Sequence, residues 1–157
     1  MNIPVILNGE KIFFQADSEE KLSSVLRRNG CLSVKTACEK GRCGSCTVLL
    51  NEKPVPSCRL PVALAINQKI ETLEGFSKSG EYTAIMKGFE KAGIELCGFC
   101  NSGKIFAAHS VICANVRPSR AAVAEKIRHL APCCTDLDTL INGILYAFEF
   151  NSRKKDV

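Results

Sequence analysis

The chain has 157 residues, of which 46% are apolar and 24% are charged, and its formal net charge is +5. These proportions are typical of globular proteins, so they argue against a largely disordered chain and allow one domain or two small ones. Because Arg153, Lys154 and Lys155 supply three of the positive charges near the C-terminus, and no basic stripe with interleaved aromatic residues is present, nucleic-acid binding is not expected.

The N-terminal residues predict a β-hairpin. Residues 3–7 and 11–16 are mainly apolar, and the Asn8-Gly9 pair between them is a strong signal for a tight turn. The first apolar run is too short for a secretory signal or a membrane span. We therefore expect a cytoplasmic protein with no membrane contact.

A helix and further strands are expected to complete the N-terminal half. The helix is predicted to be capped by Asp17 or Ser18 and to stop at Asn29-Gly30, because the residues between them repeat apolar side chains at helical spacing. The strands are expected at 47–50, 54–58 and 69–75. Residues 1–76 are therefore predicted to form a strand-rich domain.

The pattern changes to helices in residues 77–157. Four segments repeat apolar residues at helical spacing: 81–93, 103–115, 120–130 and 136–150. The expected caps are Ser79, Ser102, Ser119, and Thr135 or Asp136, with Gly93 ending the first helix. Short helices with short connections pack as a bundle, so the sequence predicts an α+β chain of two domains.

A cysteine-rich loop, CEKGRCGSC, precedes the strand at 47–50. Its cysteines have C-x4-C-x2-C spacing with a distant fourth: Cys38, Cys43, Cys46 and Cys58. This spacing is typical of a plant-type [2Fe–2S] site. A disulfide framework is disfavoured in a reducing compartment, and structural zinc sites more often use paired C-x2-C or Cys/His spacings. Gly41 and Gly44 allow the loop to wrap closely around an inorganic core.

A second group of cysteines lies at the helix junctions. Cys97 and Cys100 form a C-x2-C motif, and Cys133 and Cys134 follow one helix pair later. A thioredoxin-like redox pair is the alternative for the first motif, but no βαβ pattern surrounds it. A bundle would bring both pairs together.

The remaining cysteines and the histidines have no motif around them. Cys31 and Cys113 are interpreted as small apolar core residues. His109 and His129 are interpreted as packing or surface residues, since neither has a recognisable partner. No catalytic residues are predicted.

The quoted motifs resemble the two-cluster iron–sulfur subunit or domain of molybdenum hydroxylases such as xanthine dehydrogenase, aldehyde oxidase and carbon monoxide dehydrogenase. The resemblance spans nearly the whole chain and rests on the segments 33–58, 70–75, 91–111 and 134–145. It implies an N-terminal ferredoxin-like β-grasp domain and a C-terminal four-helix bundle. It also implies that this chain performs no substrate chemistry.

The resemblance implies specific cofactors and partners. The first [2Fe–2S] cluster would be held by Cys38, Cys43, Cys46 and Cys58, and the second by Cys97, Cys100, Cys133 and Cys134. Electrons from a molybdenum–pterin centre in a large subunit would pass through both clusters to FAD, usually on a third subunit. The leading interpretation is the electron-transfer subunit of a xanthine dehydrogenase-like oxidoreductase.

The second half departs from the family's pattern. The family has Cys-Arg-Cys where this chain has Pro132-Cys133-Cys134, so Cys133 falls where Arg is expected, and Leu96 replaces a Gln that lies beside the pterin. The alternatives to a second cluster on these four cysteines are that the second site is empty in the isolated chain, or that Cys113 replaces one ligand. Two other functions remain open: a free ferredoxin-like carrier, and a divergent regulatory or assembly subunit whose second cluster is lost.

Overall fold

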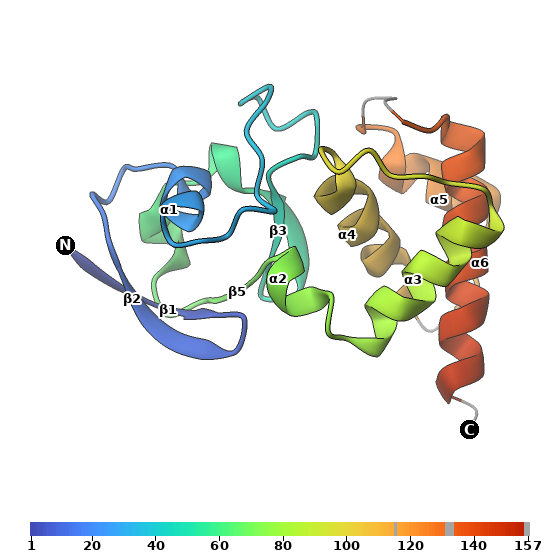
Figure 1. Cartoon of the computed structure of the whole chain (residues 1–157), viewed down its shortest axis with the longest axis horizontal. Helices are drawn as coiled ribbons and strands as arrows, with labels where there is room; N and C mark the ends of the chain where they lie inside the picture. The colour runs from blue at the N-terminus through green and yellow to red at the C-terminus, as the bar shows by residue number, and fades with distance from the viewer. Residues whose placement is uncertain (115, 131–133, 156–157) are drawn as a thin grey trace.

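The computed structural model describes residues 1–114, 116–130 and 134–155, which form a strand-rich half and a helical half side by side (Figure 1). The strand-rich half holds a five-stranded sheet with the order β2-β1-β5-β3-β4. The helical half has four main helices: α3 (Gly80–Lys91), α4 (Asn101–Ile112), α5 (Arg120–Ile127) and α6 (Leu137–Lys155). The predicted α+β class is confirmed.

The N-terminal hairpin forms as predicted. Strands β1 (Asn2–Leu7) and β2 (Glu10–Gln15) pair antiparallel. Asn8 and Gly9 both have positive φ angles, of 50° and 89°. Two such residues suit the turn that matches the twist of a hairpin, which explains why the Asn-Gly signal was reliable here.

The other strands build a mixed sheet around a parallel pair. Strands β3 (Thr47–Leu50) and β4 (Lys53–Pro56) pair antiparallel, and β5 (Lys69–Glu71) lies between β1 and β3. β5 is parallel to β1 and antiparallel to β3. The predicted last strand was too long, because the short helix α2 (Leu73–Phe76) begins two residues after β5 ends.

Helix α1 (Leu22–Arg28) contributes buried side chains to the core of the strand-rich half, including Leu22 and Leu26. The predicted cap at Asp17 or Ser18 is wrong, since the helix begins after Lys21 and has no side-chain cap. The segment before the helix is engaged elsewhere in backbone hydrogen bonds. This segment lies beside two short 3-10 helices, η1 (Ser57–Arg59) and η2 (Val62–Ala65). Leu22 N–H donates to Leu60 O and Val62 N–H donates to Glu20 O, both at 2.8 Å. Tertiary pairing therefore overrides the local capping signal.

Three of the predicted caps in the helical half are present. Ser79 Oγ accepts a hydrogen bond from Tyr82 N–H, and Ser119 Oγ accepts one from Ala122 N–H, each at 3.1 Å. At the start of α6, Asp136 Oδ1 accepts one from the backbone N–H of Thr139 at 2.8 Å. Such caps satisfy backbone donors that a helix leaves unpaired at its start.

The predicted cap at Ser102 is wrong. Helix α4 begins at Asn101, and Ser102 Oγ instead donates to the carbonyl of Ser33 at 3.2 Å. This bond joins the helical half to the segment before the cysteine-rich loop. Ser33 itself is fixed by Glu74, because the N–H and the hydroxyl of Ser33 donate to the Glu74 carboxylate at 2.8 and 2.6 Å.

Glu74 is consequently an anchor at the junction of the halves. Thr72 Oγ1 also donates to its carboxylate, at 2.6 Å. Burial alone would raise the pKa of Glu74, but the hydrogen bonds from Ser33 and Thr72 outweigh it and hold the pKa below its ordinary value.

The four main helices pack around a buried core, and α4 lies closest to the sheet (Figure 1). Almost every residue of α4 is buried, because it contacts α3, α5 and α6 as well as β3 and β4. Helices α3 and α6 approach closely at Gly88, where an added Cβ would lie 2.4 Å from Ala147 N. Among the described helices, none combines the length and apolar character needed to cross a membrane.

Candidate metal centres

The first cysteine set consists of Cys38, Cys43, Cys46 and Cys58. The loop from Cys38 to Cys46 leads into β3, and Cys58 lies in η1 directly after β4. Because β3 and β4 are paired, Cys46 and Cys58 lie beside each other at the end of this strand pair. Both are buried, whereas Cys38 and Cys43 are partly exposed at the rim.

The backbone of the loop prepares Cys38 for metal binding. Three backbone donors, the N–H groups of Lys40, Arg42 and Cys43, point at Cys38 Sγ, each at 3.3 Å. These hydrogen bonds lower the pKa of the Cys38 thiol to about 6. Gly41, at a φ of 75°, permits the tight curvature that turns these groups inward. The loop thus favours the thiolate form, which is the metal ligand.

Burial has the opposite effect at the inner edge of the set. It raises the pKa of Cys46 to about 11, and the neighbouring Cys58 thiol adds to this effect. Binding of a metal here must therefore release a proton. Two buried sulfurs and two rim sulfurs, under a loop whose N–H groups face inward, are a donor set that fits a [2Fe–2S] cluster.

The second cysteine set joins two separate helix junctions. Cys97 and Cys100 lie between α3 and α4, and Cys134 lies just before α6. The three sulfurs fall within 4.8 Å of one another, with Cys100 Sγ at 3.7 Å from Cys97 Sγ and 3.9 Å from Cys134 Sγ. Cys133 lies outside the described residues, so its ligand role stays a prediction.

A buried lysine adjoins the second cysteine set. Lys104, on the first turn of α4, is only 2% exposed, and its Nζ donates to Cys100 Sγ at 2.7 Å. A cation this close favours a thiolate ligand and added negative charge on whatever the thiolate binds. The loop itself is closed by Asn101 Oδ1, which accepts from Gly98 N–H at 2.9 Å.

The two cysteine sets are brought together by glycines. A Cβ added at Gly103, near the start of α4, would lie 2.8 Å from the Cα of Gly44, and one added at Gly44 would lie 3.0 Å from the Cα of Gly103. The loop of the first set therefore touches the helix that begins at the second set, backbone against backbone. Figure 1 shows this contact region between the two halves, on the edge where both loops lie.

At the far end of α4 the interpretation of Cys113 is wrong, whereas His109 is a buried packing residue as expected. Cys113 is exposed rather than buried in the core, and it follows α4 whereas Cys100 precedes it. At 1.5 Å per residue the helix separates them by about 20 Å, so Cys113 does not replace a ligand of the second set. His109 is also not without a partner, since its Nδ1 lies 2.6 Å from Glu81 Oε2. The H-x3-C spacing of His109 and Cys113 was the sequence signal that could have indicated that these two side chains lie together on one face of the helix. Cys31, by contrast, is buried as predicted.

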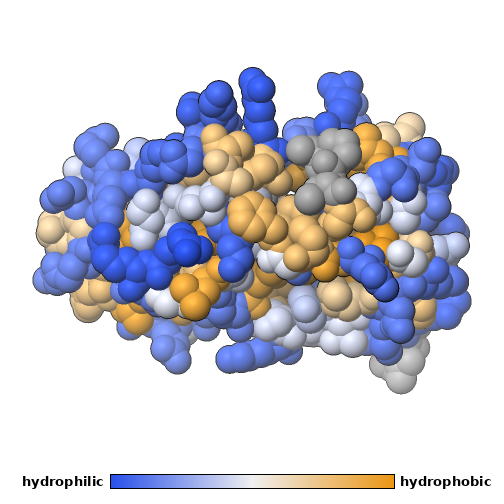
Figure 2. Space-filling view, turned by 45° about the horizontal axis from the view of Figure 1, so that its top comes forward, coloured by the Kyte–Doolittle hydropathy of each residue, from blue (hydrophilic) through white to orange (hydrophobic). Residues whose placement is uncertain are grey.

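The edge that carries the cysteine loops has apolar surface at its centre. Figure 2 turns this edge toward the viewer and shows orange surface in the middle of the face with hydrophilic side chains around it. Phe99, between Cys97 and Cys100, is 47% exposed. Aromatic side chains are enriched at protein–protein interfaces, so this apolar face suits contact with another protein.

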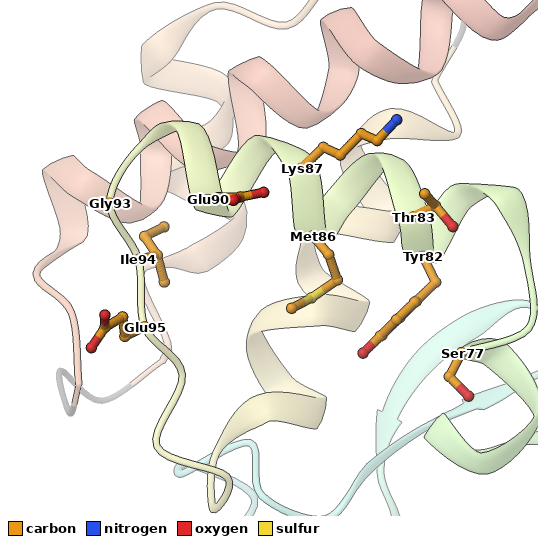
Figure 3. A pocket seen from close by; sticks show the side chains of 9 residues that line it. All are labelled: Ser77, Tyr82, Thr83, Met86, Lys87, Glu90, Gly93, Ile94 and Glu95. Carbon is orange, nitrogen blue, oxygen red and sulfur yellow. The ribbon is translucent and has the colours of Figure 1, made fainter.

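A separate groove of about 540 Å³ runs along α3 (Figure 3). Tyr82 and Met86 point from the helix to the same side of the groove, and Ile94 lies at its other end. Its lining contains no cysteine or histidine. The groove is therefore distinct from both cysteine sets.

Two family models match the chain. Residues 5–72 match a 2Fe-2S iron-sulfur cluster binding domain, and residues 72–145 match a [2Fe-2S] binding domain. Each match contains one of the two cysteine sets.

Individual relatives match over nearly their whole length. The chain is 35% identical over 148 residues to a xanthine dehydrogenase iron-sulfur-binding subunit of Escherichia coli O157:H7, covering 92% of each chain. It is 31% identical over 150 residues to a nicotinate dehydrogenase small FeS subunit of Eubacterium barkeri, covering 95% of this chain and 96% of the other.

Solved structures show the same arrangement. A chain of quinoline 2-oxidoreductase from Pseudomonas putida 86 superposes with a TM-score of 0.87 at 32% identity, covering 100% of this chain and 98% of the other. Aldehyde oxidoreductase from Desulfovibrio gigas superposes with a TM-score of 0.84 at 31% identity, covering 98% of this chain and 17% of the other.

Proposed function

The chain belongs to the two-[2Fe–2S] small-subunit family of molybdenum hydroxylases, and from this premise we propose that it serves a xanthine dehydrogenase-like enzyme. Its general role is that of the iron–sulfur electron-transfer subunit. The specific enzyme is supported by one observation, the 35% identity over 92% of both chains to a xanthine dehydrogenase iron-sulfur-binding subunit. The complex is proposed to be cytoplasmic, since the chain's ten cysteines suit a reducing compartment.

We propose that each cysteine set holds one [2Fe–2S] cluster. The ligands of the first are Cys38, Cys43, Cys46 and Cys58, and those of the second are Cys97, Cys100, Cys133 and Cys134. The N–H groups around Cys38 and the grouping of Cys97, Cys100 and Cys134 support this assignment. The proposed domain boundary lies between residues 76 and 77, next to the Glu74 anchor.

The chain's own residues would define the path between the clusters. When bound, a [2Fe–2S] cluster stores one electron at a time. Burial of Cys46 and Cys58 keeps water from the inner edge of the first set. The contact of Gly44 with Gly103 holds the two sets close, and the Lys104 ammonium favours negative charge at the second. These features suit electron relay and need no catalytic residue on this chain.

The source and acceptor of the electrons are proposed to lie on partner subunits. A large subunit would carry the molybdenum–pterin centre, and another would carry FAD. The apolar centre of the cysteine-bearing face in Figure 2 supports a protein interface there. Leu96, beside Cys97, packs partly against the core of the helical half and has no side-chain hydrogen bond to offer a pterin.

The test is purification of the tagged chain from its native source. We expect it to retain a molybdenum-containing subunit and an FAD-containing subunit, and the complex to oxidise xanthine or hypoxanthine faster than nicotinate. Recovery as a lone chain, with the cell's hydroxylase activities intact when the chain is deleted, would refute the assignment to a complex. A complex that prefers nicotinate would refute only the xanthine dehydrogenase-like specificity.

A further inference from the structure

Three potential metal ligands meet at the end of α4 that lies away from the cysteine sets. Glu81 comes from the first turn of α3, His109 from α4, and Cys113 directly follows α4. Their donor atoms lie within 4.8 Å of one another. The proposed electron relay does not use these side chains.

The imidazole of His109 is fixed in position. The residue is 7% exposed, and its ring packs edge-on against Phe76 with 5.1 Å between the centroids. Its Nδ1 lies 2.6 Å from Glu81 Oε2, so the carboxylate orients the ring. A ligand that is already held in place loses little conformational entropy when a metal binds.

Cys113 lies on the same side of α4 as His109, four residues further along. Its Sγ is 3.5 Å from His109 Nδ1, 3.6 Å from Nε2 and 3.9 Å from Glu81 Oε2. Residues four apart on a helix share a face, which is how helical pairs of ligands bind one metal. Cys113 is exposed and Glu81 is half-buried, so an ion would have access from solvent.

The electrostatic surroundings favour a cation. The C-terminal end of a helix carries partial negative charge, and Cys113 lies at that end of α4. A second carboxylate, that of Glu71, lies close enough to interact electrostatically with His109 and Glu81. Burial raises the pKa of Glu71, His109 lowers it and Glu81 raises it.

We propose that Glu81, His109 and Cys113 form a binding site for one divalent ion of the zinc class, separate from both iron–sulfur sites. The donor set of nitrogen, sulfur and carboxylate oxygen suits zinc, with water in the fourth position. Tetrahedral zinc with its usual bond lengths sets sulfur and nitrogen about 3.5 Å apart, which is the distance between Cys113 Sγ and His109 Nδ1.

Binding requires only a small rearrangement of the other two separations. Nitrogen and oxygen ligands of tetrahedral zinc lie about 3.3 Å apart, so the Glu81 carboxylate would move outward by about 0.7 Å from its present 2.6 Å. The ion would then link the start of α3 to the end of α4. A ligand that binds the folded state stabilises it, so zinc should raise the melting temperature of the helical half.

A simpler interpretation is that Glu81 only satisfies a buried histidine and that the thiol is incidental. The two interpretations differ at Cys113, because a Glu–His pair needs no thiol. The test must use protein with both iron–sulfur sites loaded, since empty cysteine sets would also bind zinc.

The experiment titrates iron-loaded protein with Zn²⁺ against a chromophoric chelator and records zinc K-edge X-ray absorption. We expect one zinc per chain, with one sulfur among its ligands, no loss of iron and a higher melting temperature. Cys113→Ser and His109→Gln should each weaken zinc binding at least tenfold, and Cys113→Ser should remove the sulfur signal. His129→Gln, the matched control at the exposed histidine, should bind as the unchanged protein does.

Three results would overturn the proposal. These are no zinc uptake by the iron-loaded protein, equal zinc affinity in Cys113→Ser, and a four-sulfur zinc shell accompanied by loss of iron, which would place the zinc in a cysteine set. If His109→Gln fails to fold, Cys113→Ser still decides, because the Cys113 side chain is exposed.

Discussion

The contact between the two cysteine sets can be tested by adding a single methyl group. In Gly103→Ala, the new Cβ would lie 2.8 Å from the Cα and 2.9 Å from the carbonyl oxygen of Gly44. Carbon atoms in contact prefer about 3.5–4.0 Å. Since both obstructing atoms belong to the backbone, α4 and the first loop must separate by roughly 0.7–1.2 Å.

The expected cost follows from two opposing effects. Overpacking of this kind costs about 1–3 kcal/mol, whereas alanine is a better helix former than glycine by up to about 1 kcal/mol. We therefore expect a net loss of about 1–2 kcal/mol. Gly80→Ala is the matched control, because its Cβ would meet only the end of the Lys154 side chain at 3.7 Å. That variant should be at least as stable as the unchanged protein.

The assay has two readouts on protein with equal iron content. Thermal unfolding followed by helical circular dichroism should show a lower melting temperature for Gly103→Ala and none of this loss for Gly80→Ala. Electron paramagnetic resonance of the fully reduced protein should show a weaker magnetic interaction between the two clusters, because that interaction falls with distance. An unchanged melting temperature together with an unchanged interaction would refute the backbone contact.

Three further predictions concern single side chains. Cys43→Ser should lower the iron content from about four to about two per chain and destabilise the strand-rich half, whose loop depends on metal for order; full iron content with an unchanged visible spectrum would contradict this. Lys104→Met should make the reduction potential of the second cluster more negative in a redox titration, because it removes a cation 2.7 Å from Cys100 Sγ; the exposed Lys87→Met serves as control, and equal potentials would contradict the role of the charge. Because the pKa of Glu74 is held low in the folded state, its interactions stabilise the fold above the ordinary glutamate pKa of about 4.3 and are lost as the pH falls below that value. Glu74→Gln should therefore reduce the loss of folding stability between neutral and acidic pH, measured by denaturant unfolding. An unchanged pH dependence of stability would contradict this role.

Local signals predicted most of the secondary structure. The Asn8-Gly9 turn, the caps at Ser79 and Ser119 and the helical periodicity of the second half depend on neighbours in the sequence, and the structure confirms them. The predictions at Asp17, Ser18 and Ser102 failed for a different reason. In these places the backbone or the hydroxyl bonds to a distant segment, which no local pattern reveals.

The candidate sites divide in the same way. The spacing of Cys38, Cys43 and Cys46 is local, so it was readable as a metal-binding loop. The approach of Gly44 to Gly103, the buried Lys104 and the meeting of Glu81 with His109 depend on how α3, α4 and the sheet pack. Such contacts join residues far apart in the sequence, and they emerge only from the tertiary structure.

The most direct test of the account is the iron and acid-labile sulfide content of the anaerobically purified chain, measured together with its paramagnetic spectra at graded reduction. Two [2Fe–2S] clusters predict about four irons per chain and two distinguishable signals. Replacing Cys133 by alanine should remove one signal and about two irons. About two irons in the unchanged protein, with a single signal that Cys133→Ala leaves intact, would contradict the two-cluster account.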